Sequence, residues 1–129
     1  MADTKLRIFV VEDEVLIAFE MSDVLEDLGF EVVGPSVHLK DAEERARTER
    51  IDAAFLDVNL GGGDTSKPVA QILRERGVPL VFITAYHRDE ITFILPDERV
   101  VRKPLTDSKL QETLAFLLPG FKARNGAEL

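Results

Sequence analysis

Four apolar, strand-like runs of this chain end on polar residues whose side chains could do chemistry. Glu12-Asp13, Asp57, Thr84 and Lys103 stand at these ends. Together they supply several carboxylates, a hydroxyl and a cation. An aspartate can attack phosphorus and form an aspartyl-phosphate, while a lysine ammonium can reach the oxygens of a phosphate. The set is therefore suited to receiving a phosphoryl group.

Three of these residues are acids that would lie together if their strands share one sheet. Glu12 and Asp13 are adjacent in a strand-to-helix turn, where both side chains can face the crevice next to Asp57. Like charges at close range raise one another's pKa values unless a cation intervenes. Mg²⁺ binds through carboxylates, waters and phosphate oxygens, so the group predicts a magnesium site. Alternatively, Glu12 and Asp13 only stabilise the N-terminus of the following helix.

Each remaining residue also has a purely structural explanation. Asp57 comes shortly before a glycine-rich stretch and could be a turn or cap residue. Thr84 suits a strand by β-propensity alone, and Lys103 could be an ordinary surface lysine. The bond before Pro104 is of the kind that can be cis, which would aim Lys103. Their shared placement at strand ends is what favours the functional interpretation.

The elements that would position these residues alternate between strand and helix. β-branched apolar runs predict five strands, and apolar residues at helical spacing predict five helices. The expected strands are Leu6–Val11, Phe30–Val33, Ile51–Leu56, Val78–Ile83 and Arg99–Arg102; the expected helices are Glu14–Leu28, Leu39–Glu49, Lys67–Arg76, Arg88–Leu95 and Asp107–Leu118. Asn59–Thr65 is expected to be a loop. This alternation predicts an α/β fold with a parallel sheet covered on both faces, in which ligands bind beyond the carboxyl ends of the strands.

The composition is that of one globular domain. The chain has 129 residues, 45% of them hydrophobic, and no cysteine, which excludes disulfides and cysteine-based metal sites. Its 16 basic and 24 acidic residues give a net charge of −8, which disfavours nucleic-acid binding. Without a signal-peptide pattern or a bilayer-length apolar run, we expect a soluble, cytoplasmic protein that does not associate with membranes. We expect one domain over residues 1–129, with its core at about 6–118 and a short tail at 119–129.

In their order and placement, these residues resemble the response-regulator receiver domains of two-component signalling. The resemblance covers about Arg7 to Leu118 and implies a flavodoxin-like, doubly wound (βα)5 fold with strand order 2-1-3-4-5. The site residues that it implies are Asp57 as phosphoacceptor, Glu12, Asp13, Asp57 and the backbone carbonyl of Asn59 as Mg²⁺ ligands, Thr84 as switch hydroxyl, Lys103 as phosphate contact and Tyr86 as switch aromatic. The alternative for Tyr86 is a half-buried surface tyrosine.

The resemblance also implies a function and partners. The phosphoryl donor would be a sensor histidine kinase or a phosphotransfer protein. Because no DNA-binding output segment is recognised, we expect a stand-alone regulator that signals through contact with a partner protein or by phosphate diversion. We expect a monomer or a weak, phosphorylation-dependent dimer, and no enzymatic activity beyond slow self-dephosphorylation.

A narrower resemblance lies in Pro79-Leu80-Val81-Phe82-Ile83-Thr84-Ala85-Tyr86, which is similar to the signature of the FAT GUY single-domain receivers. Leu80, Ile83 and Ala85 replace the Phe, Ala and Gly of that signature. The match implies a role in a stress-response phosphorelay. The glycine-rich stretch Asn59 to Asp64 differs from the Met-Pro loop common in receivers, and we expect it to be more mobile.

Three other interpretations stay open. A phosphatase of the haloacid-dehalogenase type also uses Asp and Mg²⁺, but it carries a second Asp two residues after the nucleophile, where this chain has Asn59. A pseudo-receiver would use the same fold for interaction alone, which the intact set of acids, Thr84 and Lys103 argues against. The chain could also be a receiver excised from a hybrid kinase, against which Met1 and the short tail argue mildly.

Overall fold

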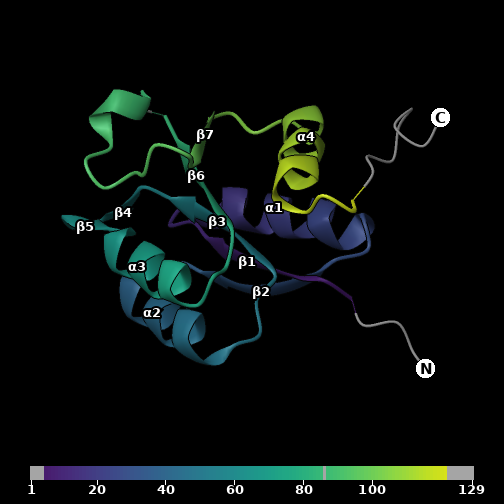
Figure 1. The fold of residues 1–129 in the computed structure, drawn as a ribbon, viewed down its shortest axis with the longest axis horizontal. Helices are drawn as coiled ribbons and strands as arrows, with labels where there is room; N and C mark the ends of the chain where they lie inside the picture. Colours follow the sequence, from purple (N-terminus) through teal and green to yellow (C-terminus); the bar gives the residue numbers. More distant parts are fainter. Residues whose placement is uncertain (1–4, 86, 122–129) are drawn as a thin grey trace.

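Strands and helices alternate along residues 5–85 and 87–121, which are the residues that this computed structural model describes (Figure 1). The strands of the main sheet are β1 (Arg7–Val11), β2 (Glu31–Ser36), β3 (Ala53–Asp57), β6 (Leu80–Thr84) and β7 (Arg99–Arg102). The helices are α1 (Val15–Asp27), α2 (Leu39–Thr48), α3 (Lys67–Glu75) and α4 (Asp107–Leu117). Two short strands, β4 (Asn59–Gly61) and β5 (Asp64–Thr65), and a 3-10 turn at Arg88–Glu90 complete the described elements.

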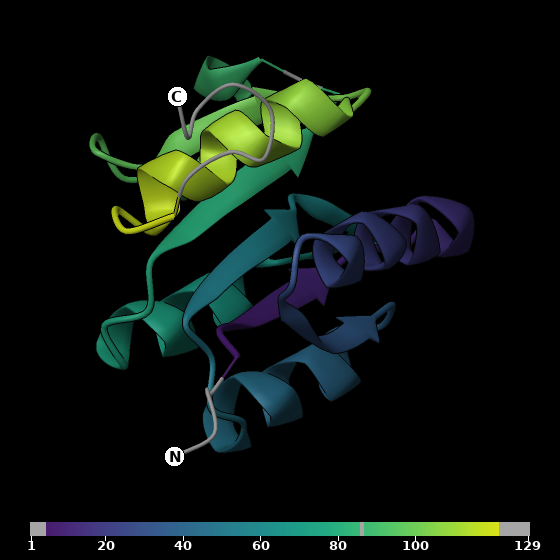
Figure 2. The same ribbon diagram turned by 90° about the vertical axis from the view of Figure 1, so that its right-hand side faces the viewer.

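The five main strands form one parallel sheet in the order β2-β1-β3-β6-β7. Since β6 and β7 are the fourth and fifth strands of this sheet along the chain, the predicted order 2-1-3-4-5 is confirmed. Figures 1 and 2 show α1 and α4 on one side of the sheet and α2 and α3 on the other. No helix in the described part of the chain is long and apolar enough to cross a membrane.

The central strand β3 explains why the sheet is covered on both faces. All five of its residues are buried, and successive side chains of a strand point to opposite faces. Ala54 and Leu56 join the core under α2 and α3, whereas Ala53 and Phe55 join the core under α1 and α4. A strand that must be apolar on both faces reads as a continuous hydrophobic run, which made it recognisable from the sequence.

Strand β2 is longer than its sequence predicts. We expected it to stop at Val33, before Gly34-Pro35, but it continues to Ser36. Proline is tolerated because β2 is an edge strand, and the pairing with β1 shifts between Phe9 and Val11. Gly34 has φ 93°, and a Cβ there would lie 2.7 Å from the backbone nitrogen of Ser36, so only glycine fits.

The predicted helix over Arg88–Leu95 is wrong, because the structure forms only a 3-10 turn at Arg88–Glu90. Tertiary contacts hold the rest of this segment in an irregular path. The Arg88 guanidinium donates to the backbone carbonyls of Leu95 and Pro96 at 2.9 Å, and also to that of Glu98. Phe93 packs edge-on against Phe82 of β6, with ring centres 5.5 Å apart. These contacts outweigh a weak helical pattern that already contained several β-branched residues.

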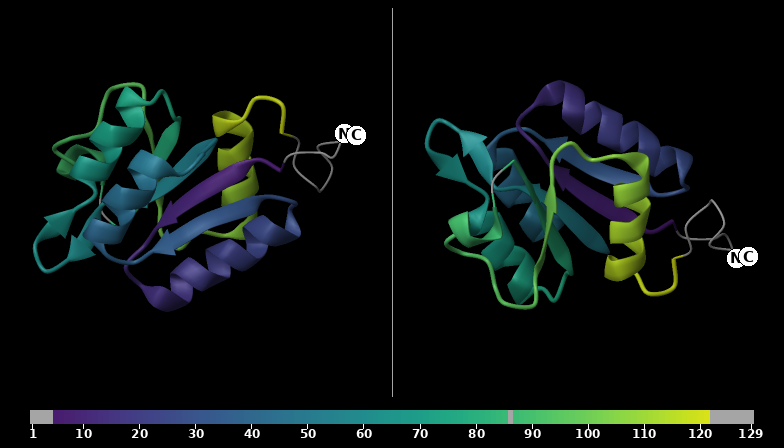
Figure 3. Two further views of the ribbon diagram at one scale, coloured as in Figure 1. Left: turned by 90° about the horizontal axis from the view of Figure 1, so that it is seen from below. Right: turned by 90° about the horizontal axis from the view of Figure 1, so that it is seen from above.

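The predicted loop Asn59–Thr65 is in fact a small antiparallel hairpin made of β4 and β5. Gly61, Gly62 and Gly63 all have positive φ at its tip, a conformation that L side chains rarely adopt. Both views in Figure 3 show this hairpin projecting beyond the main sheet. The expectation that it is more mobile than a Met-Pro loop stays a prediction.

An ion pair from α3 also anchors the segment after β6. Arg74 donates to both carboxylate oxygens of Glu98, at 2.8 and 2.6 Å, and to the carbonyl of Phe93 at 2.8 Å. Burial disfavours the ionised carboxylate of Glu98. This effect is outweighed by hydrogen bonds from Arg74 and from the Leu95 N–H, together with the positive charges of Arg74 and Arg88. The net result is a pKa of Glu98 below its ordinary value.

Replacing Glu98 with glutamine is therefore expected to lower the free energy of unfolding at neutral pH by about 1–2 kcal/mol. Because the pKa of Glu98 is lower in the folded chain than in the unfolded chain, its stabilisation is present above the unfolded-state pKa. It is lost as the pH falls through the folded-state pKa. Urea unfolding of both proteins between neutral pH and about pH 3 should show the difference shrinking in acid.

Glu44→Gln is the matched control, because the Glu44 side chain is 69% exposed and lies 4.0 Å from Arg47. It should change stability by less than about 0.5 kcal/mol. A Glu98→Gln effect that stays constant across this pH range would show that the lost stability comes from packing and not from the ionised pair.

Candidate functional site

The predicted site residues lie at one edge of the sheet, at the carboxyl ends of four strands: β1, β3, β6 and β7. Asp57 ends β3 and is paired with Ile83, the neighbour of Thr84 at the end of β6. Lys103 follows β7, and its backbone N–H donates to the carbonyl of Thr84 at 2.9 Å. Glu12 follows β1, and its N–H donates to the carbonyl of Ser36 at 3.0 Å. The extension of β2 to Ser36 thus fixes the backbone of the acidic pair.

Glu12, Asp13 and Asp57 form a tight group of acids. One carboxylate oxygen of each lies within 4.8 Å of the others, although Glu12 is fully buried and Asp57 is only 6% exposed. Glu12 Oε1 is buried without a hydrogen bond among the described residues, and it lies 3.1 Å from Lys103 Nζ outside hydrogen-bonding geometry. Converging, partly unsatisfied carboxylate oxygens are the donors that a hard divalent cation takes. These residues therefore fit Mg²⁺.

The environment of Asp57 opposes its ionisation while no divalent cation is bound. Burial is the largest cause, followed by the hydrogen bond and charge of Glu12 and the hydrogen bond of Asp13, and together they raise the pKa of Asp57 to about 8. The charge of Lys103 acts in the opposite direction. A carboxyl group whose neighbours keep its pKa this high gains the most from a nearby cation, which favours the ionised form.

Lys103 supplies positive charge to the same group of acids. Its Nζ donates to Asp57 Oδ2 at 3.2 Å, to Glu12 Oε2 at 3.2 Å and to Glu14 Oε1 at 3.0 Å. Burial disfavours the ammonium charge, but the Glu14 hydrogen bond and the charges of Asp57 and Glu12 outweigh it, so the pKa of Lys103 is raised. The bond between Lys103 and Pro104 is cis, as the sequence suggested.

Glu14 is a site neighbour that the sequence interpretation missed. Its Oε1 lies 3.0 Å from Lys103 Nζ, closer to this atom than the oxygens of Glu12 and Asp57, while the Glu14 side chain is 60% exposed. The signal that could have found it is the run of three acids, Glu12-Asp13-Glu14. Glu14 therefore contacts the lysine ammonium from the exposed rim and competes for it with Asp57, without belonging to the buried group of acids.

The other predicted residues take different places. Thr84 is buried, at 1% exposure, beside Lys103. Asn59 is exposed and begins the hairpin, two residues past Asp57. Tyr86, the predicted switch aromatic, lies outside the described residues. The hairpin itself borders the acids, since a Cβ on Gly61 would lie 3.5 Å from Asp13 Oδ2.

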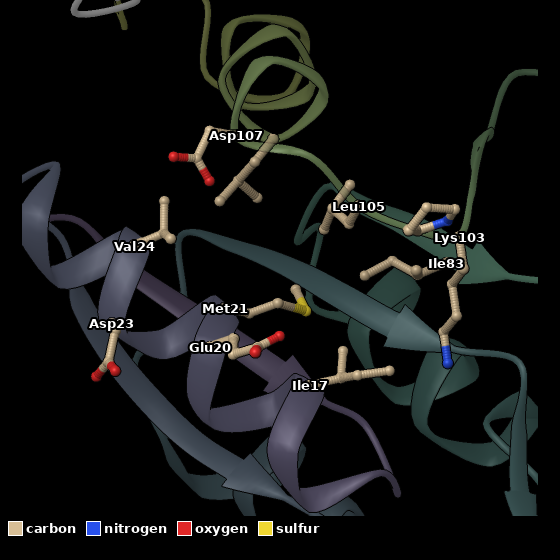
Figure 4. A pocket seen from close by; sticks show the side chains of 11 residues that line it. Ile17, Glu20, Met21, Asp23, Val24, Ile83, Lys103, Leu105 and Asp107 are labelled. Carbon is tan, nitrogen blue, oxygen red and sulfur yellow. The ribbon is translucent and has the colours of Figure 1, made fainter.

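A hollow of about 410 Å³ opens next to this site, between α1 and the start of α4. Figure 4 shows Ile17, Met21 and Val24 of α1 facing Leu105 across it, with Lys103 at its edge. The hollow is mainly apolar, with acids at its rim.

Comparison with known proteins identifies the fold and its family. The family model of the response regulator receiver domain matches residues 8–115. The solution structure of SdrG from Sphingomonas melonis Fr1 is 40% identical, covers 91% of this chain and 99% of its own, and superposes with a TM-score of 0.78. A solution structure of SdrG in its BeF3-activated conformation is 41% identical, with coverages of 90% and 99% and a TM-score of 0.74.

Curated relatives are longer than this chain. The phyllosphere-induced regulator PhyR of Methylorubrum extorquens is 28% identical over 120 residues, which are 91% of this chain and 45% of PhyR. The transcriptional regulatory protein PdtaR of Mycobacterium tuberculosis is 28% identical over 85 residues, which are 66% of this chain and 42% of PdtaR. The chain thus spans less than half the length of these relatives.

Proposed function

The chain belongs to the response regulator receiver domain family of two-component signalling, and from this premise we propose that Asp57 accepts a phosphoryl group from a sensor histidine kinase or a phosphotransfer protein. The observation that carries the proposal is the position of Asp57, buried among acids with Lys103 Nζ 3.2 Å from its Oδ2. A carboxylate oxygen of Asp57 would form a bond to phosphorus while the bond from phosphorus to the donor's imidazole nitrogen breaks. The imidazole keeps the electron pair of that bond.

The acidic group supports a magnesium requirement. Glu12, Asp13, Asp57 and the backbone carbonyl of Asn59 would hold Mg²⁺, which offsets the negative charge of phosphoryl oxygens during transfer. Lys103 already lies against Asp57 and is placed to contact a phosphoryl oxygen. The buried hydroxyl of Thr84 is the proposed donor to another oxygen.

Phosphorylation is proposed to act on the surface around β7. Thr84 would move toward the phosphoryl group and Tyr86 would turn inward, so that the segment after β6, β7 and α4 repack. A new charge that gains hydrogen bonds biases such a two-state element. Because residues 88–98 form only a 3-10 turn followed by a clamped, irregular path, we propose that this segment is the part that rearranges.

The first two turns of α1 are the proposed contact for the phosphoryl donor. Val15, Leu16 and Phe19 are 50%, 79% and 56% exposed, and they make up half of the six exposed large hydrophobic residues of the described chain. They lie directly after the acidic pair, beside the hollow between α1 and α4. Apolar side chains gathered next to a reactive site are typical of a protein contact.

Output is proposed to be contact with a partner protein or phosphate diversion in the cytoplasm. The resemblance of residues 79–86 to the FAT GUY signature supports a place in a stress phosphorelay. We further propose that the chain is not a phosphatase, since Asn59 stands where a haloacid-dehalogenase enzyme needs its second acid. Turnover of a generic phosphate ester would contradict this.

The proposed function is tested by amide NMR spectra recorded with and without Mg²⁺ and beryllofluoride. Binding is expected to shift the amides at the carboxyl ends of β1, β3, β6 and β7, with further shifts across residues 88–102. Replacing Asp13 with asparagine should weaken Mg²⁺ binding by at least about 10-fold, because it removes one charged ligand, and even the hydrogen-bonding partners of metal ligands contribute that much. If beryllofluoride with Mg²⁺ present shifts no amide signals of the wild-type chain, a pseudo-receiver that is never phosphorylated would be favoured.

The matched control for Asp13→Asn is Asp23→Asn, an exposed aspartate of α1 on the rim of the neighbouring hollow. Asp13 precedes α1 and Asp23 lies within it, so the control removes the same charge nearby while leaving the acidic group intact. Equal weakening of Mg²⁺ binding by both variants would mean that Mg²⁺ is attracted by the general negative charge of the chain and not held by a defined site.

A further inference from the structure

A groove with basic walls lies where β7, α4 and the segment after β6 meet. We call it the basic groove. It is lined by the arginines Arg88, Arg99 and Arg102, by His87, Val100 and Phe116, and by the acids Asp97 and Glu98, of which Glu98 is paired with Arg74. It has a volume of about 490 Å³. The whole chain carries a net charge of −8, so three arginines gathered at one place run against its overall charge. None of the proposed phosphoryl chemistry uses them.

Two of these arginines flank an outer strand of the sheet. Strand β7 lies at the edge of the sheet, and Arg99 and Arg102, three positions apart, leave it from opposite faces. Arg99 stacks on Phe116 of α4, with Cζ 3.9 Å from the ring centre. Arg102 Nη1 donates to His87 Nδ1 at 3.2 Å. The two guanidiniums therefore lie on either side of the strand, and the Cα atoms of Arg99 and Arg102 are roughly 10 Å apart.

These arginines have no carboxylate partner within the described residues. None of the ion pairs found there involves Arg88, Arg99 or Arg102. Arg88 directs its donors to backbone carbonyls, and the nearby carboxylate of Glu98 is bound by Arg74. A guanidinium has five N–H donors, so Arg99 and Arg102 keep donors available for an incoming anion.

Exposed apolar side chains lie next to the arginines of the basic groove. Phe116 is 46% exposed, and Leu95, which lines a neighbouring hollow together with Phe116, is 42% exposed. Arginine beside an exposed aromatic ring is a composition enriched at protein–protein contacts. The groove thus offers carboxylate-binding donors and an apolar contact within the span of a short peptide segment.

We propose that the basic groove docks an acidic segment of a partner protein. Two carboxylates of that segment pair with Arg99 and Arg102, and an apolar side chain between them packs against Phe116 and Leu95. Arginine binds carboxylates through paired N–H donors, which gives such a contact defined geometry. The inference rests on the proposed function in one respect, since it names the chemistry of an output partner.

Two other occupants fit less well. A second copy of this chain, joined by two-fold symmetry, would bring the basic groove against itself and oppose arginine to arginine. A nucleic acid needs an extended basic surface, whereas this groove holds three arginines, is bordered by Asp97, and belongs to a chain of net charge −8.

The test uses the whole unphosphorylated chain and a synthetic peptide that alternates glutamate and leucine. Titration followed by amide NMR is expected to give saturable shifts at residues 99–102 and in the second half of α4. Arg99→Glu and Arg102→Glu should each weaken binding at least about tenfold, because each turns an attractive pair into a repulsive one. Arg99→Gln and Arg102→Gln, which only remove the charge, are second variants whose folding is easier to preserve.

Arg47→Glu on α2 is the matched control, since its side chain is 55% exposed and it makes the same change of charge far from β7. It should leave peptide binding unchanged, and a peptide with glutamine in place of glutamate should bind at least about tenfold more weakly. The inference is overturned if Arg47→Glu weakens binding as much as Arg102→Glu, or if the shifts lie elsewhere. It is also overturned if Arg102→Glu abolishes self-association of the chain, or binding of a single-stranded oligonucleotide, without affecting the peptide. Beryllofluoride binding tests the proposed function separately, so the two can fail independently.

Discussion

Replacing Asp57 with asparagine is expected to abolish labelling of the chain by a phosphorylated histidine donor. The amide of asparagine has nearly the shape of the carboxylate but no nucleophilic oxygen of comparable strength, so no aspartyl-phosphate can form. Asp57 Oδ2 lies 3.2 Å from Lys103 Nζ. Glu12 also contacts Lys103 but is fully buried, and none of the contacts of Lys103 within the described residues reaches Asp13. Transfer of radiolabelled phosphoryl groups from a phosphotransfer protein, followed by gel analysis, measures the loss.

Asp64→Asn is the control for this experiment, because Asp64 is an exposed aspartate of the adjacent hairpin. It should be labelled as the wild type is, and the label of both should be lost in base, as expected for an acyl phosphate. Undiminished labelling of Asp57→Asn, with a bond that survives these conditions, would place the phosphoryl group on another residue. If no phosphorylated donor labels the wild-type chain, the proposed function itself is wrong.

The second large effect concerns stability. Phe82→Ala should lower the free energy of unfolding by about 3–5 kcal/mol, because it removes a large, fully buried side chain and leaves a cavity. Phe82 lies in the core under α2 and α3 and packs edge-on against Phe93, 5.5 Å away between ring centres. Urea unfolding followed by circular dichroism measures the change. Residues 88–98 should also lose amide protection, since Phe93 anchors them.

Phe19→Ala makes the same chemical change on the exposed face of α1, where 56% of Phe19 is accessible. It should alter stability by less than about 0.5 kcal/mol. If Phe82→Ala costs no more than Phe19→Ala, the side chain of Phe82 is not part of a close-packed core, and the placement of β6 inside the sheet, between β3 and β7, would be wrong.

The parts of this fold that the sequence predicts well are those governed by local period and by parallel-sheet geometry. Strands β3 and β6 are uninterrupted apolar runs because they are buried on both faces. Once such strands are parallel, their carboxyl ends must share one edge. That rule alone brings Asp57 to Lys103, two residues 46 positions apart in the chain.

The parts that the sequence does not predict depend on contacts between distant residues. No local sequence pattern predicts that the Arg88 guanidinium will bind carbonyls seven to ten residues later. The ion pair between Arg74 and Glu98 is equally unpredictable from local sequence. The missing helix follows from these contacts. Strand β2 continues past Gly34-Pro35 because Gly34 takes a positive φ and its register with β1 shifts. The contact from Glu14 to Lys103 likewise depends on the fold being in place.

The clamped segment of residues 88–98 has a consequence for how the chain folds and opens. A helix orders as a cooperative unit with a costly nucleus. Beyond its 3-10 turn, this segment instead depends on contacts with the side chains of Arg74, Phe82 and Arg88. It can order only after β6 and α3 have formed, so we expect it to fold late. Its opening breaks a few discrete contacts and leaves the sheet intact, which places it among the low-energy local openings of the native state. A stretch that orders last and opens first is where a small change in free energy at Asp57 has most effect.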